Sequence, residues 1–230
     1  MTDLKGKHIV VVGAAGGIGA ALCARLNAQG VKLSICSQSA EKIQTLADQL
    51  ENVCACAVDV TKEDQVAAFY KAAFEKFGKF DALVNLAGLS IPGKIPATEE
   101  EAYDQMMDVN VKGTFLACKH FPQYAEKPSI IVNIGSMAAR TANPNAPLYC
   151  TAKAAVNMLS KGLLLQVGSE DIRVTTINPG GVDTPFWGTR AVDKSKLMQA
   201  DEVVDVIMFV LASSPKIQIH NIDFESKARF

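Results

Sequence analysis

The chain has 230 residues, of which 49% are apolar and 20% are charged, and its formal net charge is -1. A chain of this length and composition can bury a sizeable core, and its scattered basic residues argue against a nucleic-acid or membrane surface. No apolar stretch is long enough for a signal peptide or a membrane span, so we expect a cytoplasmic protein. The cysteines show no metal-ligand spacing and are interpreted as reduced thiols, so no metal site is predicted.

In chain order, apolar runs typical of strands alternate with segments that have helical spacing. Residues 8–12 (HIVVV) form a β-branched run, and residues 18–30 then place apolar side chains at helical intervals and end in Gly30. The same alternation predicts strands at 8–12, 31–36, 53–60, 80–88, 129–136, 172–181 and 216–224. It predicts helices at 18–30 and 39–50, a third that starts at 61, a fourth from 98 through 115, and a long one at 147–168.

The start of two helices and the class of the fold follow from local patterns. Thr61 and Thr98 are each followed three residues later by an acidic residue, which predicts a hydroxyl cap on the first helical turn. The strands do not alternate polar and apolar residues, as expected when helices cover both faces of a sheet. The sequence therefore predicts an α/β fold with a doubly wound parallel sheet. Because no linker or repeat divides the chain, we expect one domain over residues 1–230.

A glycine-rich turn follows the first predicted strand. In VGAAGGIG (12–19), Gly13, Gly17 and Gly19 permit a tight turn and let backbone amides approach a pyrophosphate at the start of the next helix. A doubly wound sheet binds ligands outside the carboxyl ends of its strands, and this turn lies there. A tight strand-to-helix turn without a ligand is the alternative interpretation.

The residues after the second strand bear on the choice of cofactor. They are Ser37, Gln38 and Ser39, with Lys42 close behind. At this position an acidic residue binds the ribose hydroxyls of NAD, whereas a basic or neutral polar group can accept the 2'-phosphate of NADP. No acid is present here, which favours NADP, with NAD as the alternative. A polar loop that contacts no ligand also fits.

The third and fourth strands end in further polar or small residues. Asp59 closes the third strand, where it either accepts a hydrogen bond from an adenine amino group or caps the following turn. Asn85, Ala87 and Gly88 close the fourth strand and leave a narrow place where a ribose can pass over the backbone. Another glycine turn without a ligand is the alternative, and position alone does not separate the two.

Three polar side chains are expected to meet at this same edge of the sheet. Ser136 ends the fifth strand, and Tyr149 and Lys153 lie one turn apart on one face of the next helix. A phenol has a pKa of about 10, so it exchanges protons poorly near neutrality unless positive charge favours the phenolate. We therefore expect Lys153 to lower the pKa of Tyr149, which would act as a general acid or base while Ser136 binds the substrate oxygen. A surface Tyr–Lys pair is the alternative.

Together these motifs resemble those of the short-chain dehydrogenase/reductase family, in its single-domain Rossmann-fold branch. The resemblance covers most of the chain and rests on GAAGGIG (13–19), DV (59–60), NLAG (85–88), VNVKGTF (109–115), NIGS (133–136), YCTAK (149–153) and NPGGVDTP (178–185). It implies a Rossmann-like sheet of about seven strands, a nicotinamide cofactor, and the catalytic residues Ser136, Tyr149 and Lys153.

The resemblance also implies roles for residues outside this trio. Asn110 would be a fourth catalytic residue that holds a water relaying protons toward Lys153, although a structural bond from Asn110 to the backbone fits the residue pattern equally well. Thr184 would bond the nicotinamide carboxamide. The implied cofactor contacts are Gly13, Gly17, Ile18, Gly19, Ser37, Gln38, Asp59, Val60, Asn85, Ala87, Gly88, Tyr149, Lys153, Pro179, Gly180, Val182 and Thr184.

The expected function is hydride transfer between NADP or NAD and a ketone or secondary alcohol. The substrate would be a 3-oxoacyl thioester, a small hydroxy acid or a polyol. A binding protein that senses NAD(P) without turnover is the alternative. Residues 184–200, which include Phe186 and Trp187, are expected to form a short substrate flap, unless they are simply core. The helix at 147–168 is apolar nearly all round, which predicts a homo-oligomer, a dimer or tetramer, with a buried monomer core as the competing explanation.

Overall fold

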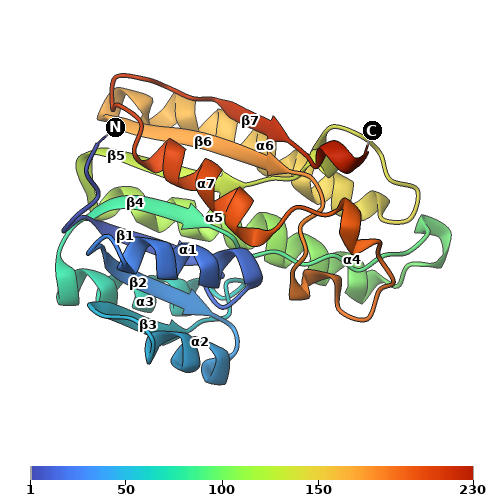
Figure 1. Cartoon of the computed structure of the whole chain (residues 1–230), viewed down its shortest axis with the longest axis horizontal. Helices are drawn as coiled ribbons and strands as arrows, with labels where there is room; N and C mark the ends of the chain where they lie inside the picture. The colour runs from blue at the N-terminus through green and yellow to red at the C-terminus, as the bar shows by residue number, and fades with distance from the viewer. Residues whose placement is uncertain (1, 230) are drawn as a thin grey trace.

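Figure 1 shows a computed structural model of the protein, which describes residues 2–229. At its centre lies a seven-stranded parallel sheet with the strand order β3-β2-β1-β4-β5-β6-β7. The chain builds outward from β1 to β3 and then returns to add β4 to β7 on the other side, which confirms the predicted doubly wound fold. The strands are β1 (His8–Val12), β2 (Lys32–Ser37), β3 (Val53–Ala57), β4 (Phe80–Asn85), β5 (Ala125–Ile134), β6 (Ile172–Pro179) and β7 (Asn221–Phe224).

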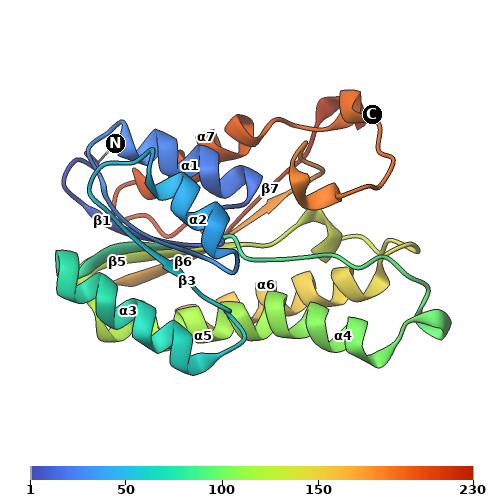
Figure 2. The same ribbon diagram turned by 90° about the horizontal axis from the view of Figure 1, so that it is seen from below.

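Helices cover both faces of this sheet, as Figure 2 shows. One face carries α1 (Gly17–Asn27), α2 (Ala40–Ala47) and α7 (Ala200–Leu211). The opposite face carries α3 (Glu63–Phe77), α5 (Gly113–His120) and α6 (Pro147–Val167), with α4 (Glu100–Met107) leading into α5. Within residues 2–229, no helix is both long enough and apolar enough to cross a bilayer.

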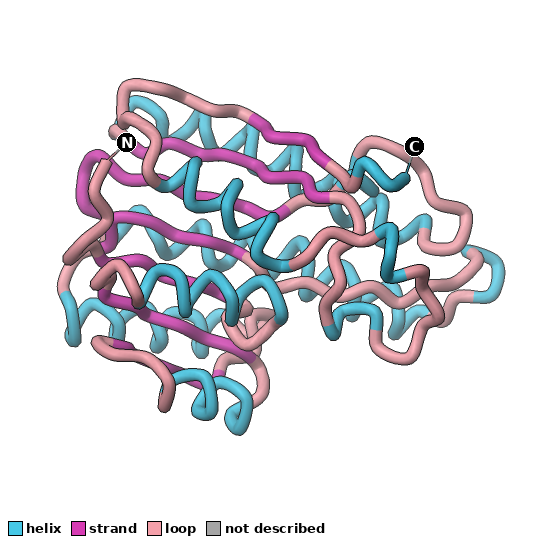
Figure 3. Tube along the Cα trace, viewed as in Figure 1, coloured by secondary structure: helices cyan, strands magenta, loops and turns pink. Residues whose placement is uncertain are grey.

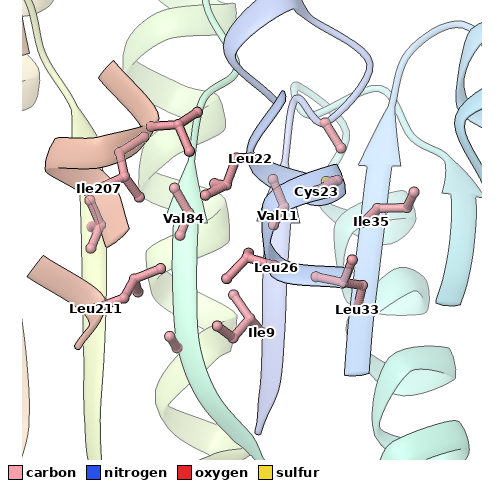
Figure 4. Packing of buried hydrophobic residues seen from close by; sticks show 14 of the residues in the cluster. Ile9, Val11, Leu22, Cys23, Leu26, Leu33, Ile35, Val84, Ile207 and Leu211 are labelled. Atoms are coloured by element: carbon pink, nitrogen blue, oxygen red, sulfur yellow. The ribbon is translucent and has the colours of Figure 1, made fainter. Parts of the chain in front are cut away.

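The strands are apolar along their length because successive side chains enter different cores. Val11 of β1 belongs to the cluster that contains Leu22 and Leu26 of α1 (Figure 4), whereas the adjacent Val10 belongs to the cluster with Phe69 of α3. Both valines are fully buried. Side chains alternate between the faces of a strand, so two covered faces require two apolar residues in succession. This packing fixes α1 against β1 and thereby places the glycine turn between them.

The predicted elements are present, but several limits differ from the expectations. Strand β3 ends at Ala57 rather than at 60, and β4 ends at Asn85, so Asp59, Ala87 and Gly88 lie in loops. The expected helix from 98 through 115 is divided by a π-helical turn at Asp108–Lys112. The last strand starts at Asn221 rather than at 216.

The two predicted threonine caps are wrong. Thr61 and Thr98 each precede the true N-cap by one residue, and neither cap makes a side-chain hydrogen bond. The Thr61 hydroxyl donates to Asp59 Oδ1 at 2.8 Å, and the Thr98 hydroxyl donates to the Lys94 carbonyl at 2.9 Å. A capping box does occur at the start of α7, where Gln199 and Glu202 form reciprocal side-chain-to-backbone hydrogen bonds. From the sequence, no helix is predicted at this position.

The carboxyl ends of the central strands meet at one edge of the sheet, to the right in Figure 1. Val12, the last residue of β1, pairs with Cys36 of β2 and with Asn85 of β4. Asn85 pairs in turn with Asn133 of β5. The loops that follow these strands therefore adjoin one another, and the predicted site residues lie in or next to them.

Candidate active site

Ser136, Tyr149 and Lys153 come together at this edge. Ser136 follows β5 and caps the short helix Met137–Ala139, where its Oγ accepts a hydrogen bond from the Ala138 amide at 3.1 Å. Tyr149 lies in the first turn of α6, and the nearby Ser136 side chain favours the ionised form of its hydroxyl and so lowers its pKa. Lys153 lies one turn later with its Nζ 5.8 Å from the centroid of the Tyr149 ring. The predicted convergence of the three side chains is therefore present.

Lys153 is a buried cation. Only 4% of its surface is exposed, and its Nζ donates a hydrogen bond to the Ile134 carbonyl at 3.0 Å. Burial lowers the pKa of Lys153 to about 8, because an ammonium group loses hydration in this position. No carboxylate within the described chain forms an ion pair with it. Lys153 is thus held next to the phenol by backbone rather than by an acidic partner.

The expected acidification of Tyr149 by Lys153 is not found in the protein alone. Burial raises the pKa of Tyr149 to about 12, and the Ser136 side chain and the charge of Arg190 offset that rise only in part. The Lys153 ammonium, 5.8 Å from the centroid of the Tyr149 ring, donates its hydrogen bond to the Ile134 carbonyl rather than to the phenol oxygen. Residue spacing reports proximity but not the loss of water around the phenol, which raises the pKa of Tyr149 in the protein alone, and the lowering expected in the complete site stays a prediction.

Asn110 lies in the π-helical turn at Asp108–Lys112, and its side chain is fully buried. Its Nδ2 donates to the carbonyl oxygens of Met106 and Leu89, each at 2.8 Å, so the structural bond to backbone exists. Its Oδ1 has no hydrogen-bond partner in the described part of the chain. A Cβ built on Gly88 would lie 2.8 Å from this Oδ1 and 3.3 Å from Lys153 Nζ, so the orphaned acceptor and the ammonium flank the same glycine. This arrangement suits a donor such as water between them.

The glycine turn between β1 and α1 packs closely against neighbouring loops and leaves the first amides of α1 available to an anion. Gly13 has φ +82°, and a Cβ there would lie 2.5 Å from the Ala87 amide, so the β1 turn abuts the loop after β4. Gly17 faces the Thr184 side chain, with a Cβ distance of 2.7 Å. Gly16 caps α1 without a side-chain hydrogen bond, and Ile18 and Gly19 belong to the first helical turn. The first amides of a helix lack internal partners, so this uncapped end fits a dinucleotide pyrophosphate.

Of the three polar residues at the end of β2 that bear on the choice of cofactor, two lie where a nucleotide could reach them and one has a structural role. Ser37 ends β2, and Gln38 is exposed beside it. The Ser39 hydroxyl accepts a hydrogen bond from the Lys42 amide at 3.3 Å and caps α2, so it has a structural role. Ser37 and Gln38 therefore remain as the candidates that can hold a ribose or its phosphate.

The side chains of Asp59 and Asn85, which were predicted to contact the cofactor, both make hydrogen bonds within the protein. Asp59 Oδ1 accepts from both the amide and the hydroxyl of Thr61, which is the turn-capping alternative. These bonds lower the pKa of Asp59. The Asn85 side chain is buried, and its Nδ2 donates to Asn133 Oδ1 at 2.6 Å. The Asn85 Nδ2 is thus engaged within the core, whereas its buried Oδ1 has no hydrogen-bond partner among the described residues.

The remaining predicted cofactor residues lie at or after the end of β6, apart from Val60, which follows β3. Pro179 ends β6, and the next residue, Gly180, donates its amide to the Phe224 carbonyl at 2.8 Å. Val182 is buried and pairs with Met198 across the base of the segment 184–199, and Val60 is buried against Gly113. Apart from Thr184, these residues shape the backbone more than they present polar atoms.

The segment 184–199 covers Tyr149 in part. Figure 3 shows this segment as loop with short helical turns at the carboxyl edge. The Phe186 ring lies 5.7 Å from the Tyr149 ring, and Phe186 is 38% exposed, as expected of a flap residue. Met198 is buried, so the core alternative holds for that residue. The sequence pattern identifies the aromatic residues of this segment but not Arg190, whose charge lowers the pKa of Tyr149.

A network of asparagines also holds the Ser136 loop and was not expected. Asn178 Oδ1 accepts from the Ser136 amide at 3.0 Å and from Asn157 Nδ2 at 2.9 Å. Asn178 Nδ2 donates to Asp223 of β7 at 2.7 Å. The available sequence signal is an asparagine at the end of an apolar strand, where an uncharged amide needs buried partners.

Known proteins are similar to this chain in both sequence and fold. The sequence profile described as short chain dehydrogenase matches residues 7–195. Two relatives named as uncharacterized oxidoreductases, from Staphylococcus aureus strain MRSA252 and Staphylococcus haemolyticus strain JCSC1435, are each 31% identical over 226 residues, which is 96% of this chain and 98% of the relative.

Solved structures give the same result. A short-chain dehydrogenase/reductase from Serratia marcescens BCRC 10948 has a TM-score of 0.88 at 26% identity and covers 96% of this chain and 98% of that chain. An alcohol dehydrogenase from the archaeon Thermococcus sibiricus, complexed with 5-hydroxy-NADP, has a TM-score of 0.88 at 26% identity and covers 96% of this chain and 97% of that chain. With these matches along nearly its whole length, the chain belongs to the short-chain dehydrogenase/reductase family and is an oxidoreductase.

Proposed function

We propose that the protein interconverts a small secondary alcohol and its ketone with NADP, and that Tyr149 is the general acid/base. In the oxidative direction the alcohol loses a hydride and a proton, giving the ketone, NADPH and H⁺. The observation that supports this most directly is the meeting of Tyr149 with Ser136 and the buried Lys153. A protein that only sensed the cofactor would have no use for such a proton-transfer group.

Each of these side chains has a distinct task in the proposal. The nicotinamide, when bound, accepts or supplies the hydride. Ser136 donates a hydrogen bond to the substrate oxygen, which fixes it beside the Tyr149 hydroxyl. Tyr149 takes the proton during oxidation and returns it during reduction. Lys153 supplies positive charge beside the phenol and, with the orphaned Oδ1 of Asn110, holds a water that passes the proton onward.

The preference for NADP over NAD rests on the loop after β2. Ser37 and Gln38 carry no negative charge, so nothing at this point repels a 2'-phosphate. The uncapped start of α1 and the close fit of Gly17 to Thr184 support a dinucleotide at this edge. NAD is the second candidate. The archaeal neighbour complexed with an NADP derivative is in keeping with the first choice.

The decisive experiment replaces Tyr149 with phenylalanine. A panel of hydroxy acids, polyols and 3-oxoacyl thioesters is followed by nicotinamide absorbance with both cofactors, and the best substrate is carried forward. Tyr149→Phe keeps the ring but removes the proton, so kcat should fall at least ~100-fold with cofactor binding retained. Tyr124→Phe is the matched control, because Tyr124 packs against Phe74 and Phe80 away from the trio. Unchanged turnover in Tyr149→Phe would remove this residue from the mechanism.

We also propose that the chain is a single domain and assembles as a homo-oligomer, a dimer or tetramer. The sheet takes strands from His8 through Phe224, which supports one domain. Helix α6 presents Met158 and Leu165 to solvent, with 65% and 87% of their surfaces exposed. Large apolar side chains exposed to this degree on one helix favour a contact with a second copy. Light scattering of the purified protein tests this, and a monomer at micromolar concentration would contradict it.

A further inference from the structure

The segment 184–199 holds an unpaired cation next to Tyr149. The Cζ atom of Arg190 lies 5.3 Å from the ring centroid of Phe186 and 5.0 Å from that of Trp187. The Phe186 ring is itself 5.7 Å from the ring of Tyr149. The Phe186 ring is therefore a neighbour of both the guanidinium and the phenol ring.

Backbone and ring contacts hold the Arg190 head group in place. Nε donates to the Trp187 carbonyl at 2.8 Å, and Nη2 donates to the Phe186 carbonyl. The faces of the two aromatic rings add a cation–π attraction. Nη1 has no hydrogen-bond partner within residues 2–229. The group is thus fixed in position and still has donors to offer.

No acidic residue of the described chain neutralises this charge. Within the same part of the chain, Lys194 pairs with Asp183 at 3.0 Å, and Asp193 accepts from Ser195. Among residues 2–229, Arg190 forms no ion pair, although it is half-buried. A partly buried guanidinium that lacks an anion gains strongly from a carboxylate, with which its planar fork makes two parallel hydrogen bonds.

We propose that Arg190 binds a carboxylate on the substrate, so that the alcohol oxidised beside Tyr149 belongs to a small hydroxy acid and the ketone to an oxo acid. This rests on the proposed function and selects one of its three substrate classes. The carboxylate is unchanged in the reaction, because hydride and proton leave only the alcohol carbon and its oxygen. Since Arg190 and Tyr149 both neighbour the Phe186 ring, we expect the acid group to lie close to the carbinol carbon, as in short 2-, 3- and 4-hydroxy acids.

The first test compares each hydroxy acid with its uncharged methyl ester. The wild-type enzyme should prefer the acid by roughly 10- to 100-fold in kcat/KM, which is the range for a charge-assisted hydrogen bond. In Arg190→Met this ratio should fall to near one, mainly through a higher KM, and Arg190→Lys should keep part of it. Lys194→Met is the matched control, because its charge lies on the same segment but is paired with Asp183, and the ratio should persist.

A second measurement does not depend on turnover. Trp187 is the only tryptophan in the chain, and its ring lies under the Arg190 guanidinium. Saturable changes in its fluorescence should follow addition of a short hydroxy acid, not of the methyl ester, and should be lost in Arg190→Met. Circular dichroism confirms that the variant is folded.

The outcomes separate this inference from the proposed function. Equal use of acid and ester by the wild-type enzyme, or an acid preference and fluorescence response that survive in Arg190→Met, would overturn the role of Arg190 while leaving alcohol oxidation intact. Saturable acid binding without turnover of any alcohol would support Arg190 and contradict the proposed function.

Discussion

Replacing Lys153 with methionine should make the cofactor-free protein more stable near neutral pH, although the residue belongs to the proposed catalytic trio. The Lys153 side chain is 4% exposed, and within the described chain its Nζ makes a hydrogen bond only to the Ile134 carbonyl. Burial lowers its pKa from 10.5 to about 8. A group whose charged form is disfavoured in the folded state opposes folding wherever it remains protonated.

The size and sign of the effect follow from that shift. A difference of about 2.5 pKa units corresponds to about 3 kcal/mol against the folded state at pH 7, where Lys153 is charged both folded and unfolded. Between pH 8 and 10.5 the unfolded chain holds more of this proton, so the penalty is relieved as the pH rises. Methionine removes the charge but leaves the Ile134 carbonyl unpaired, which costs about 1 kcal/mol. The net gain at pH 7 is about 2 kcal/mol.

Urea unfolding of the cofactor-free proteins measures this difference. Lys153→Met should exceed the wild type by about 2 kcal/mol at pH 7 and lose that advantage by about pH 10, where Lys153 is neutral. Tyr149 is present in both proteins, so its own raised pKa cancels in the comparison. Lys161→Met on the exposed side of α6 is the control and should change stability by less than about 0.5 kcal/mol. A Lys153→Met protein that is less stable than wild type at pH 7, or a difference independent of pH, would refute the reasoning.

Two further changes test the cofactor side of the site. Gly13→Ala should lower the free energy of unfolding by more than about 2 kcal/mol, because φ is +82° and the new Cβ would lie 2.5 Å from the Ala87 amide. Gly30→Ala has a similar φ of +72° but a nearest atom at 3.5 Å, so urea unfolding should show a loss of only about 1 kcal/mol. Gln38→Asp should weaken NADPH at least ~10-fold more than NADH in calorimetric titrations, and an equal loss would show that this loop does not reach the 2'-phosphate.

The layered fold was predictable because it depends on a pattern that the chain repeats. Val10 and Val11 are adjacent and both fully buried, which happens only when both faces of a strand are covered. The glycine turn at Gly13 and the one-turn spacing of Tyr149 and Lys153 are also local, so their place at the carboxyl edge followed from the topology.

The features that differ depend on partners distant in sequence. Whether the amide of Asn85 faces the core or the ligand edge is decided by Asn133, 48 positions away, which accepts its hydrogen bond. The prediction of the threonine caps was wrong for a local reason. Helix α3 has its N-cap at Lys62, one residue after Thr61, so the Thr61 hydroxyl cannot cap the first turn. The unexpected helix α7 carries a local signal, the reciprocal pair Gln199 and Glu202, which shows that some missing information was present in the sequence.

The exclusion of water from the site cannot be read from the spacing of residues in the sequence. It connects the two proposals, the acid/base role of Tyr149 and the binding of a carboxylate by Arg190. Burial raises the pKa of Tyr149 and lowers that of Lys153, so the same exclusion of water disfavours the charged form of both groups. In such a place each nearby charge has a larger effect, because Coulomb interactions increase as the effective dielectric falls. The charge of Arg190 already lowers the pKa of Tyr149. A carboxylate bound to Arg190 would cancel part of that effect, so the two proposals together predict that substrate recognition and proton transfer at Tyr149 are electrostatically coupled.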